Sequence, residues 1–282
     1  MLKALIENSI FTKIYQSVSW PNWKSPITFG FIILGSYSLY AVNALGFGRN
    51  PTQLLVTVLT CYILDTLFFY IRFKQLRFTL GGATSGFGLF FLFDSAYLWM
   101  FFLLAVVTIT IKHLFTYKDR HIFNPTNFAL LLVCYAFQDI SNFHSMRWGG
   151  ELFWSLTFVM LGTALTIYAK RWIVSFTFIF CFILFAYIKS ILFPISFTLM
   201  LLPILGPGLQ LYSFFMITDP MTSPQKSIEQ IIFSVLLALI DTVLRFQQNR
   251  FAALISLSTV CALFVIKKYL SDNKLKIYVP VS

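Results

Sequence analysis

The chain has 282 residues, of which 58% are hydrophobic and 11% are charged, and its formal net charge is +11. A soluble protein of this length could not bury so much apolar side chain, including 34 phenylalanines, and could not cover its surface with so few charges. The basic residues are scattered over many short loops without a clustered patch, so the charge does not indicate a nucleic-acid-binding protein.

Residues 1–25 differ from the rest of the chain because they mix apolar and basic side chains without an uninterrupted apolar run. Phe11 and Trp20, for example, stand near Lys3 and Lys13. This pattern predicts an interfacial N-terminal segment rather than a cleaved signal peptide.

Apolar windows then recur along the whole chain. A helix of roughly 20 residues crosses the ~30 Å hydrocarbon layer of a bilayer, and shorter or longer windows indicate tilted, broken or re-entrant pieces. We therefore expect an all-α polytopic membrane protein with about ten transmembrane helical elements, of which the elements between 79 and 111 and the long eighth window are the hardest to delimit. The windows are 27–45, 52–71, 79–93, 95–111, 123–138, 151–169, 172–190, 192–217, 227–244 and 251–267.

The basic residues predict the orientation of these helices. If the N-terminus is cytoplasmic and the elements alternate, 16 of the 21 lysines and arginines fall on the cytoplasmic side. This bias predicts that both termini are cytoplasmic. The five basic residues on the other side are Arg49, Arg147, Lys189, Arg245 and Arg250.

The first unusual polar segment is residues 120–129, Arg-His-Ile-Phe-Asn-Pro-Thr-Asn-Phe-Ala, at the start of an apolar window. The side-chain amides of Asn124 and Asn127 need hydrogen-bond partners there, either backbone groups or a bound heterocycle. The alternative is that Asn124 only caps a helix that has Pro125 at its first position.

The second unusual segment is residues 214–224, which contains Thr218, Asp219 and Thr222 and follows the helix-breaking Gly206-Pro207-Gly208. Unwound backbone at membrane depth persists only where it is buried in protein or lines a cavity. The alternative is a simple turn before the next helix. Because the predicted topology places both polar segments on the cytoplasmic face, we expect them to lie close together.

Two carboxylates lie inside apolar windows, Asp65 and Asp241. Each is expected to be paired, protonated or exposed to water, because an isolated charge costs at least ~2.5–3.5 kcal/mol there. They are the candidates for an intramembrane ion or proton path, although more often such residues belong to a polar cluster within the bundle. The cysteines and histidines show no metal-binding spacing, so no metal site is predicted.

The motifs resemble those of the RnfD and NqrB family of membrane electron-transport subunits. Lys112-His113-Leu114-Phe115 and the Asn-Pro-Thr-Asn of residues 124–127 are similar to that family's Lys-x-x-Phe and its Asn-Pro-rich helix start. Thr218-Asp219-Pro220 is similar to its late Thr-Asp-Pro motif. The form of the motifs looks most like that of free-standing relatives, including the UnbU-type proteins found with enediyne biosynthesis.

The resemblance implies two five-helix pseudo-symmetric repeats, here residues 26–150 and 151–270, with residues 271–282 as a cytoplasmic tail. It also implies a flavin near the cytoplasmic face and electron transfer across the membrane. The family's outer-loop Ser/Thr-Gly-Ala-Thr, which carries covalent FMN, is absent from residues 138–150. The Gly82-Ala83-Thr84 sequence lies on the other side of the membrane, so we interpret it as close helix packing or a helix break and expect no covalent FMN.

The leading hypothesis is a redox protein of the bacterial cytoplasmic membrane that binds riboflavin or FMN non-covalently. It would relay electrons to or from a redox partner protein or a lipid quinone, as a membrane oxidoreductase or its electron-transfer subunit. Alternatives are a small-solute or ion transporter or channel with a related repeat fold, and a structural subunit whose cofactor site has decayed. The candidate cofactor-binding residues are Phe123, Asn124, Asn127, Phe128, Thr218, Asp219 and Thr222.

Overall fold

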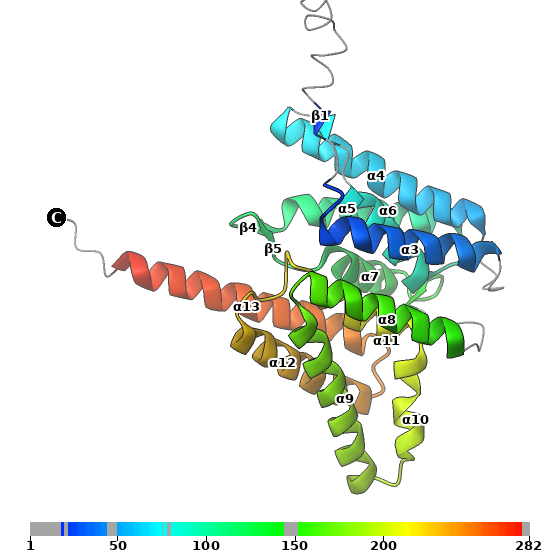
Figure 1. The fold of residues 1–282 in the computed structure, drawn as a ribbon, viewed down its shortest axis with the longest axis vertical. Coiled ribbons are helices and arrows are strands. Elements are labelled where there is room, and N and C mark those ends of the chain that lie inside the picture. Colours follow the sequence, from blue (N-terminus) through cyan, green and yellow to red (C-terminus); the bar gives the residue numbers. More distant parts are fainter. Residues whose placement is uncertain are drawn as a thin grey trace, which may run out of the picture.

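The computed structural model of the chain describes residues 18–19, 22–43, 50–74, 76–77, 80–143 and 152–277. Most of the predicted interfacial segment 1–25 and part of the 138–150 loop lie outside these ranges. Within them the structure is an all-α polytopic membrane fold with a few two-residue strands (Figure 1).

Helical residues occupy every predicted window. In the first half these helices are α3 (Pro26–Asn43), α4 (Pro51–Phe73), α5 (Leu80–Leu92), α6 (Leu98–Leu114) and α7 (Pro125–Ala136). In the second half they are α8 (Leu152–Tyr168), α9 (Trp172–Leu192), α10 (Phe197–Leu201), η1 (Leu202–Leu205), α11 (Pro207–Leu211), η2 (Tyr212–Met216), α12 (Ser227–Phe246) and α13 (Ala252–Ile277). The last helix therefore continues into the predicted tail.

Five of the described helices are long and apolar enough to cross a membrane, namely α3, α4, α9, α12 and α13 up to Asp272. A sixth span results if the pair Phe197–Leu205 and Gly208–Met216, bent by 66°, counts as one. Four further apolar helices are shorter: α5, α6, α7 and α8. The count of ten spanning elements thus stays a prediction.

The bend falls where the sequence predicted a helix break. Gly206 has an extended backbone (φ −85°, ψ 142°) between η1 and α11, and Pro207 begins the next helix. Proline has no backbone N–H and clashes with the preceding helical turn, so an α-helix cannot run through this point without distortion. The chain therefore re-enters the bundle as the separate segment α11–η2.

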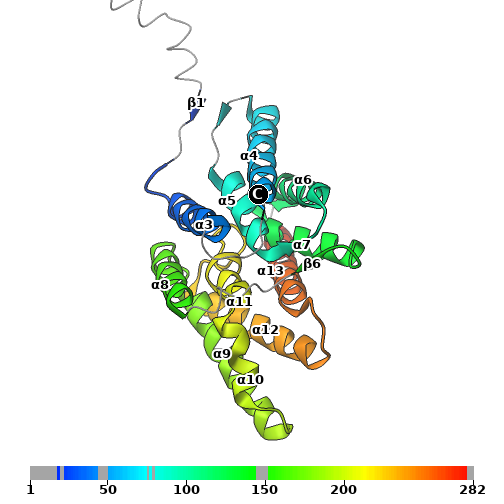
Figure 2. The ribbon, with the colours of Figure 1, turned by 90° about the vertical axis from the view of Figure 1, so that its right-hand side faces the viewer.

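The helices of the first half of the chain lie together above those of the second half, as Figures 1 and 2 show. Within the first half α4 contacts α5 and α6, α6 contacts α7, and α3 contacts α5. Within the second half α9 contacts α10 and α12, α12 contacts α13, and α8 contacts α11 and η2. Among the described helices, contacts between the halves include α3 with α8, α5 with α11, and α7 with α13.

Short strands tie the loops at the two ends of the bundle. At one end β1 (Val18–Ser19) pairs in parallel with β2 (Leu76–Arg77), and β4 (Thr116–Tyr117) pairs antiparallel with β5 (Arg120–His121). At the other end β3 (Phe93–Asp94) pairs antiparallel with β6 (Asn142–Phe143).

The end that holds β4 and β5 also gathers the loop before α12 and the end of α13. Arg120 bonds to the backbone of residues 220–223, and Lys118 pairs with Asp272 at 2.7 Å. Tyr168 at the end of α8 donates to the Lys24 carbonyl on the same side. We call this end the basic face, and the predicted orientation makes it cytoplasmic.

Cysteine labelling tests that orientation. A cysteine at Lys118 on the basic face should resist an impermeant thiol reagent in intact cells, whereas a cysteine at Asp139 in the opposite loop should react. The four native cysteines are buried, so they should add little background. Labelling at Lys118 with protection at Asp139 would reverse the predicted topology.

Candidate functional site

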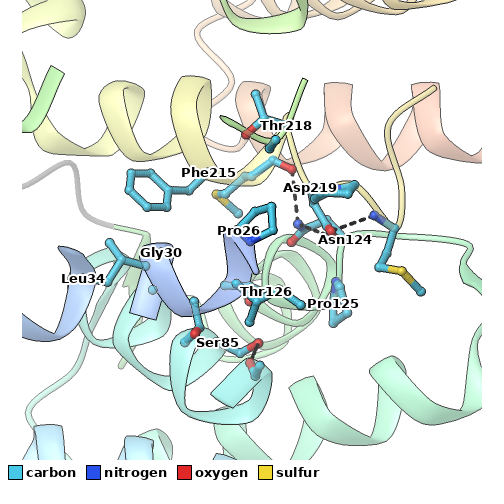
Figure 3. Close-up of a pocket in the computed structure, with 18 of the residues that line it drawn as sticks. Pro26, Gly30, Leu34, Ser85, Asn124, Pro125, Thr126, Phe215, Thr218 and Asp219 are labelled. Carbon is cyan, nitrogen blue, oxygen red and sulfur yellow. Dashed lines mark hydrogen bonds between the residues drawn. The ribbon is translucent and has the colours of Figure 1, made fainter. Parts of the chain in front are cut away.

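The two polar segments meet at Asn124, the residue that precedes α7 (Figure 3). Its amide Nδ2 donates to the Met216 carbonyl at 3.2 Å and lies 3.4 Å from the Asp219 carboxylate. Its Oδ1 accepts the backbone N–H of Asn127 at 3.0 Å. Asn124 is therefore a helix N-cap and, at the same time, a direct connection between the two halves of the chain.

Asp219 organises the turn that follows the broken helix. Its Oδ1 accepts the Met221 N–H at 2.9 Å, and its carbonyl accepts the backbone N–H groups of Thr222 and Ser223 at 3.1 and 2.9 Å. A carboxylate that accepts backbone N–H bonds stabilises a turn in one geometry. The negative charge is thus held at the end of η2.

Two arginines hold the same turn from outside. Arg120 in β5 donates to the carbonyls of Pro220, Met221 and Ser223 at 2.7–3.2 Å. Arg171, which is buried before α9, donates from Nε to Ser223 Oγ at 2.9 Å. We call the three carbonyl contacts of Arg120 the Arg120 clasp.

A cavity of about 200 Å³ lies beside this junction, and residues from both halves line it. Figure 3 shows Asn124 and Asp219 on one side and α3 on the other. Glycines and small polar side chains of α5 form part of the wall, where Thr84 and Ser85 donate to backbone carbonyls of their own helix at 2.8 and 3.0 Å. The apolar part of the wall includes Ile27, Leu34, Leu165 and Phe215.

Lys112 of α6 lines the cavity and carries a positive charge at its edge. Its Nζ lies 2.8 Å from Asp65 Oδ2, and His113 Nε2 lies 2.8 Å from the other oxygen of the same carboxylate. Asp65 is buried in α4. The sequence predicted that this carboxylate is paired, protonated or exposed to water, and the structure shows it paired. Buried charges are tolerated in this way, by pairing and hydrogen bonding.

His121 of β5 also lines the cavity, and its Nδ1 is buried with no hydrogen-bond partner among the described residues. Burial lowers the pKa of His121, an effect that the nearby Asp219 carboxylate partly opposes. The imidazole is therefore neutral near pH 7 and has one ring nitrogen that donates and one that accepts. The residue lines the cavity, although its Nδ1 atom has almost no accessible surface.

The predicted site residues divide into two groups. Asn124, Thr218 and Asp219 line the cavity, whereas Asn127, Phe123, Phe128 and Thr222 do not. Asn127 is fully buried and donates to the Leu254 carbonyl and to Ser258 Oγ of α13 at 2.9 and 3.0 Å.

Phe123 and Phe128 stack on each other, with ring centroids 4.1 Å apart and planes 13° apart, so each covers the other. Thr222 lines a different cavity, nearer the end of α13. In this structure, then, the aromatic pair and Asn127 pack the protein beside the cavity.

The second predicted carboxylate, Asp241 of α12, is fully buried and accepts from Arg245 Nε at 2.6 Å, one turn along the same helix. Asp65 and Asp241 thus belong to different halves of the chain and pair with different basic residues. The ion or proton path that they were proposed to form stays a prediction. Among the described residues no group of three or more metal-ligating side chains occurs.

The glycines near Thr84 pack α5 closely against α4. A Cβ on Gly82 would lie 2.7 Å from Asp65 Cβ, and a Cβ on Gly86 would lie 2.7 Å from Val58 Cα. The interpretation as close helix packing is therefore confirmed for this segment.

Sequence reasoning missed three residues of the site: Lys112, His121 and Arg120. Lys112 belongs to the Lys-x-x-Phe motif, but its pairing with Asp65, 47 residues earlier in the chain, depends on the packing of α6 on α4. His121 and Arg120 carried no such signal, because their roles depend on how β5 places them against residues 218–223.

Residues 138–258 match the NQR2, RnfD, RnfE family, a family of membrane subunits of electron-transport complexes. This region of the chain is similar to that family. The matched region contains the Thr218-Asp219-Pro220 motif, one of the motifs that resemble those of RnfD and NqrB. The Asn-Pro-Thr-Asn motif lies before the matched residues but contacts the matched part of the site directly. No curated protein matches the chain.

Proposed function

We propose that the protein is a membrane redox protein that binds a flavin non-covalently in the cavity beside Asn124 and Asp219. Electrons would pass between that flavin and a redox partner protein or a lipid quinone. The observation that carries the proposal is the cavity itself, which lies where the two polar motifs of an electron-transport family meet.

The lining fits the chemistry of an isoalloxazine ring. That ring system has an apolar dimethylbenzene end and a polar end with two carbonyls and an imide N–H. The cavity offers aliphatic and aromatic side chains together with the polar residues Lys112 and His121. Its volume of about 200 Å³ is below the roughly 300–1,000 Å³ of usual ligand pockets, so it suits the ring rather than a whole flavin nucleotide.

When bound, a flavin supplies one- and two-electron chemistry at its ring. The residues of the chain would exclude water from the ring and orient it. Lys112, whose Nζ lies 2.8 Å from Asp65 Oδ2, would donate to a ring carbonyl and favour added electron density there.

The two five-helix repeats, with both termini in the cytoplasm, form part of this proposal. In support, the helix contacts of the first half correspond to those of the second half when α3 is matched with α8, α4 with α9, and α6 with α12. The contacts between the halves join matched helices, such as α7 and α13. If the halves are such repeats, a cavity between them would lie close to the pseudo-twofold axis that relates them.

The second candidate function is transport of a small solute or ion without a cofactor. The 66° bend between Phe197–Leu205 and Gly208–Met216 supports it, because broken helices near the middle of the membrane line substrate sites in transporters. The two functions differ in whether the purified protein holds a chromophore.

The test is the colour of the purified protein. We expect absorbance in the usual flavin bands, release of the flavin on denaturation, and no fluorescent band after denaturing electrophoresis. Gly30→Leu should lower the flavin content, because a Cβ at Gly30 is tolerated, 3.7 Å from Leu165 Cδ2, while the rest of the side chain enters the cavity.

The control for added bulk is Leu39→Phe on the outer surface of the same helix, where the side chain is 60% exposed. It should keep the full flavin content. A colourless protein that folds and binds no added flavin would favour transport. A band whose fluorescence disappears in Thr84→Ala would contradict the non-covalent site.

A further inference from the structure

A second cavity, of about 320 Å³, opens on the basic face beside the first. Its walls are β4, β5, the loop before α12, the first turn of α12 and the end of α13. His121 and Met221 line both cavities, so the two cavities adjoin at these residues.

The charges of this second cavity are not balanced. Four cationic side chains and two carboxylates line it: Arg120, Lys226, Lys267, Lys268, Glu229 and Asp272. Both carboxylates are already paired, Glu229 with Lys267 at 3.1 Å and Asp272 with Lys118 at 2.7 Å. The guanidinium of Arg120 is occupied by the carbonyls of its clasp.

Two lysines of the second cavity, Lys226 and Lys268, therefore remain without a paired carboxylate in the part of the chain that the structure describes. Within the described residues no carboxylate lies within salt-bridge distance of Lys226 or Lys268. Lys226 stands at the N-terminus of α12 and offers no side-chain cap to that helix, so the positive end of a 20-residue helix adds to the field. This combination favours a doubly charged anion over a neutral ligand.

We propose that the two cavities form one site for flavin mononucleotide, with the ring in the first cavity and the phosphate beside Lys226 and Lys268 in the second. The inference rests on the proposed function and adds to it the choice between the two flavins, because riboflavin has no phosphate. Together the cavities have the volume of a cofactor pocket, which the first alone lacks. The ribityl chain passes His121 and Met221.

An anionic lipid headgroup carries the same phosphate chemistry and is the alternative occupant. The experiment therefore uses full-length protein, depleted of flavin, in nanodiscs of phosphatidylcholine alone or with phosphatidylglycerol. Flavin fluorescence gives the dissociation constants for FMN and for riboflavin at low and at high salt.

We expect FMN to bind at least about tenfold more tightly than riboflavin in both lipids, with a preference that decreases as salt screens the charges. The Lys226→Gln, Lys268→Gln double variant should weaken FMN by roughly ten- to a hundredfold and leave riboflavin unchanged. The control removes the same charge from the end of α4 with Arg72→Gln and Lys74→Gln. Both residues are exposed on the basic face, and neither lines the first or the second cavity.

Equal affinities for the two flavins, or equal losses for both in the lysine variant, would overturn the phosphate site. An FMN preference that appears in phosphatidylcholine and vanishes with phosphatidylglycerol would assign the lysines to lipid instead and overturn it as well. Absence of binding by either flavin would reject the proposed function itself, which separates the two failures.

Discussion

Replacing Asp65 with alanine is expected to destabilise the protein by about 3–5 kcal/mol, because it leaves a buried cation without its counter-ion. The carboxylate is 1% exposed, and both of its oxygens are bonded, one by Lys112 and one by His113. His113 also stacks on Phe68, with ring centroids 5.0 Å apart, so loss of the carboxylate disturbs a packed aromatic pair. The thermal midpoint of the purified protein in detergent measures the effect.

Arg72→Ala provides the comparison, since it breaks an ion pair of 3.8 Å with Asp119, whose side chain is 95% exposed. Exposed pairs contribute about 0–1 kcal/mol, so this midpoint should hardly move. A second variant, Asp65→Leu with Lys112→Met, removes both charges and should recover much of the lost stability. If Asp65→Ala has the same thermal midpoint as the parent, the buried ion pair does not stabilise this fold.

Gly86→Ala is expected to destabilise the protein strongly, because it adds a methyl group to a tightly packed face of α5. The new Cβ would lie 2.7 Å from Val58 Cα and 3.1 Å from the Thr57 carbonyl oxygen, both of which are backbone atoms of α4. Relief requires the two helices to separate, which costs about 1–3 kcal/mol or more. Loss of monodisperse protein on size-exclusion chromatography, together with a lower thermal midpoint, would show it.

Gly88→Ala is its matched control on the same helix, because there the nearest atom to a new Cβ is Thr126 Cγ2 at 3.8 Å. Alanine is a better helix former than glycine by about 1 kcal/mol, so this variant should equal or exceed the parent in stability. Equal behaviour of the two variants would mean that α4 and α5 are not in close contact in the membrane.

Much of the fold could be predicted from hydropathy and helix-breaking residues. Each apolar window contains at least one helix within the described residues, and the break at Gly206 and Pro207 divides the eighth window as expected. The meeting of the two polar segments also followed from the sequence, since alternating spans place both on one face, and Asn124 does contact Asp219. These inferences needed only the order of the elements.

The direction of individual side chains could not be predicted in the same way. Asn127 lies three residues after Asn124, but Asn124 has an extended backbone (φ −63°, ψ 118°) and precedes the helix, so helical spacing does not put the two amides on one face. The rotation of α7 about its axis is set by its packing on α13, and it turns Asn127 toward Leu254 and Ser258. The hydropathy pattern of the sequence does not determine the rotation of α7 about its axis.

The Arg120 clasp has a consequence for how the two halves can move. It joins β5, in the first half, to three carbonyls in the second, and Asn124 adds a second connection beside it. A rocking motion that alternately opened each side would have to break these bonds in every cycle and re-form them. A relay of electrons needs the opposite property, because a fixed separation between donor and acceptor keeps the transfer rate constant. The clasp therefore favours a protein whose two halves keep a fixed arrangement, in which electrons would move while the helices do not.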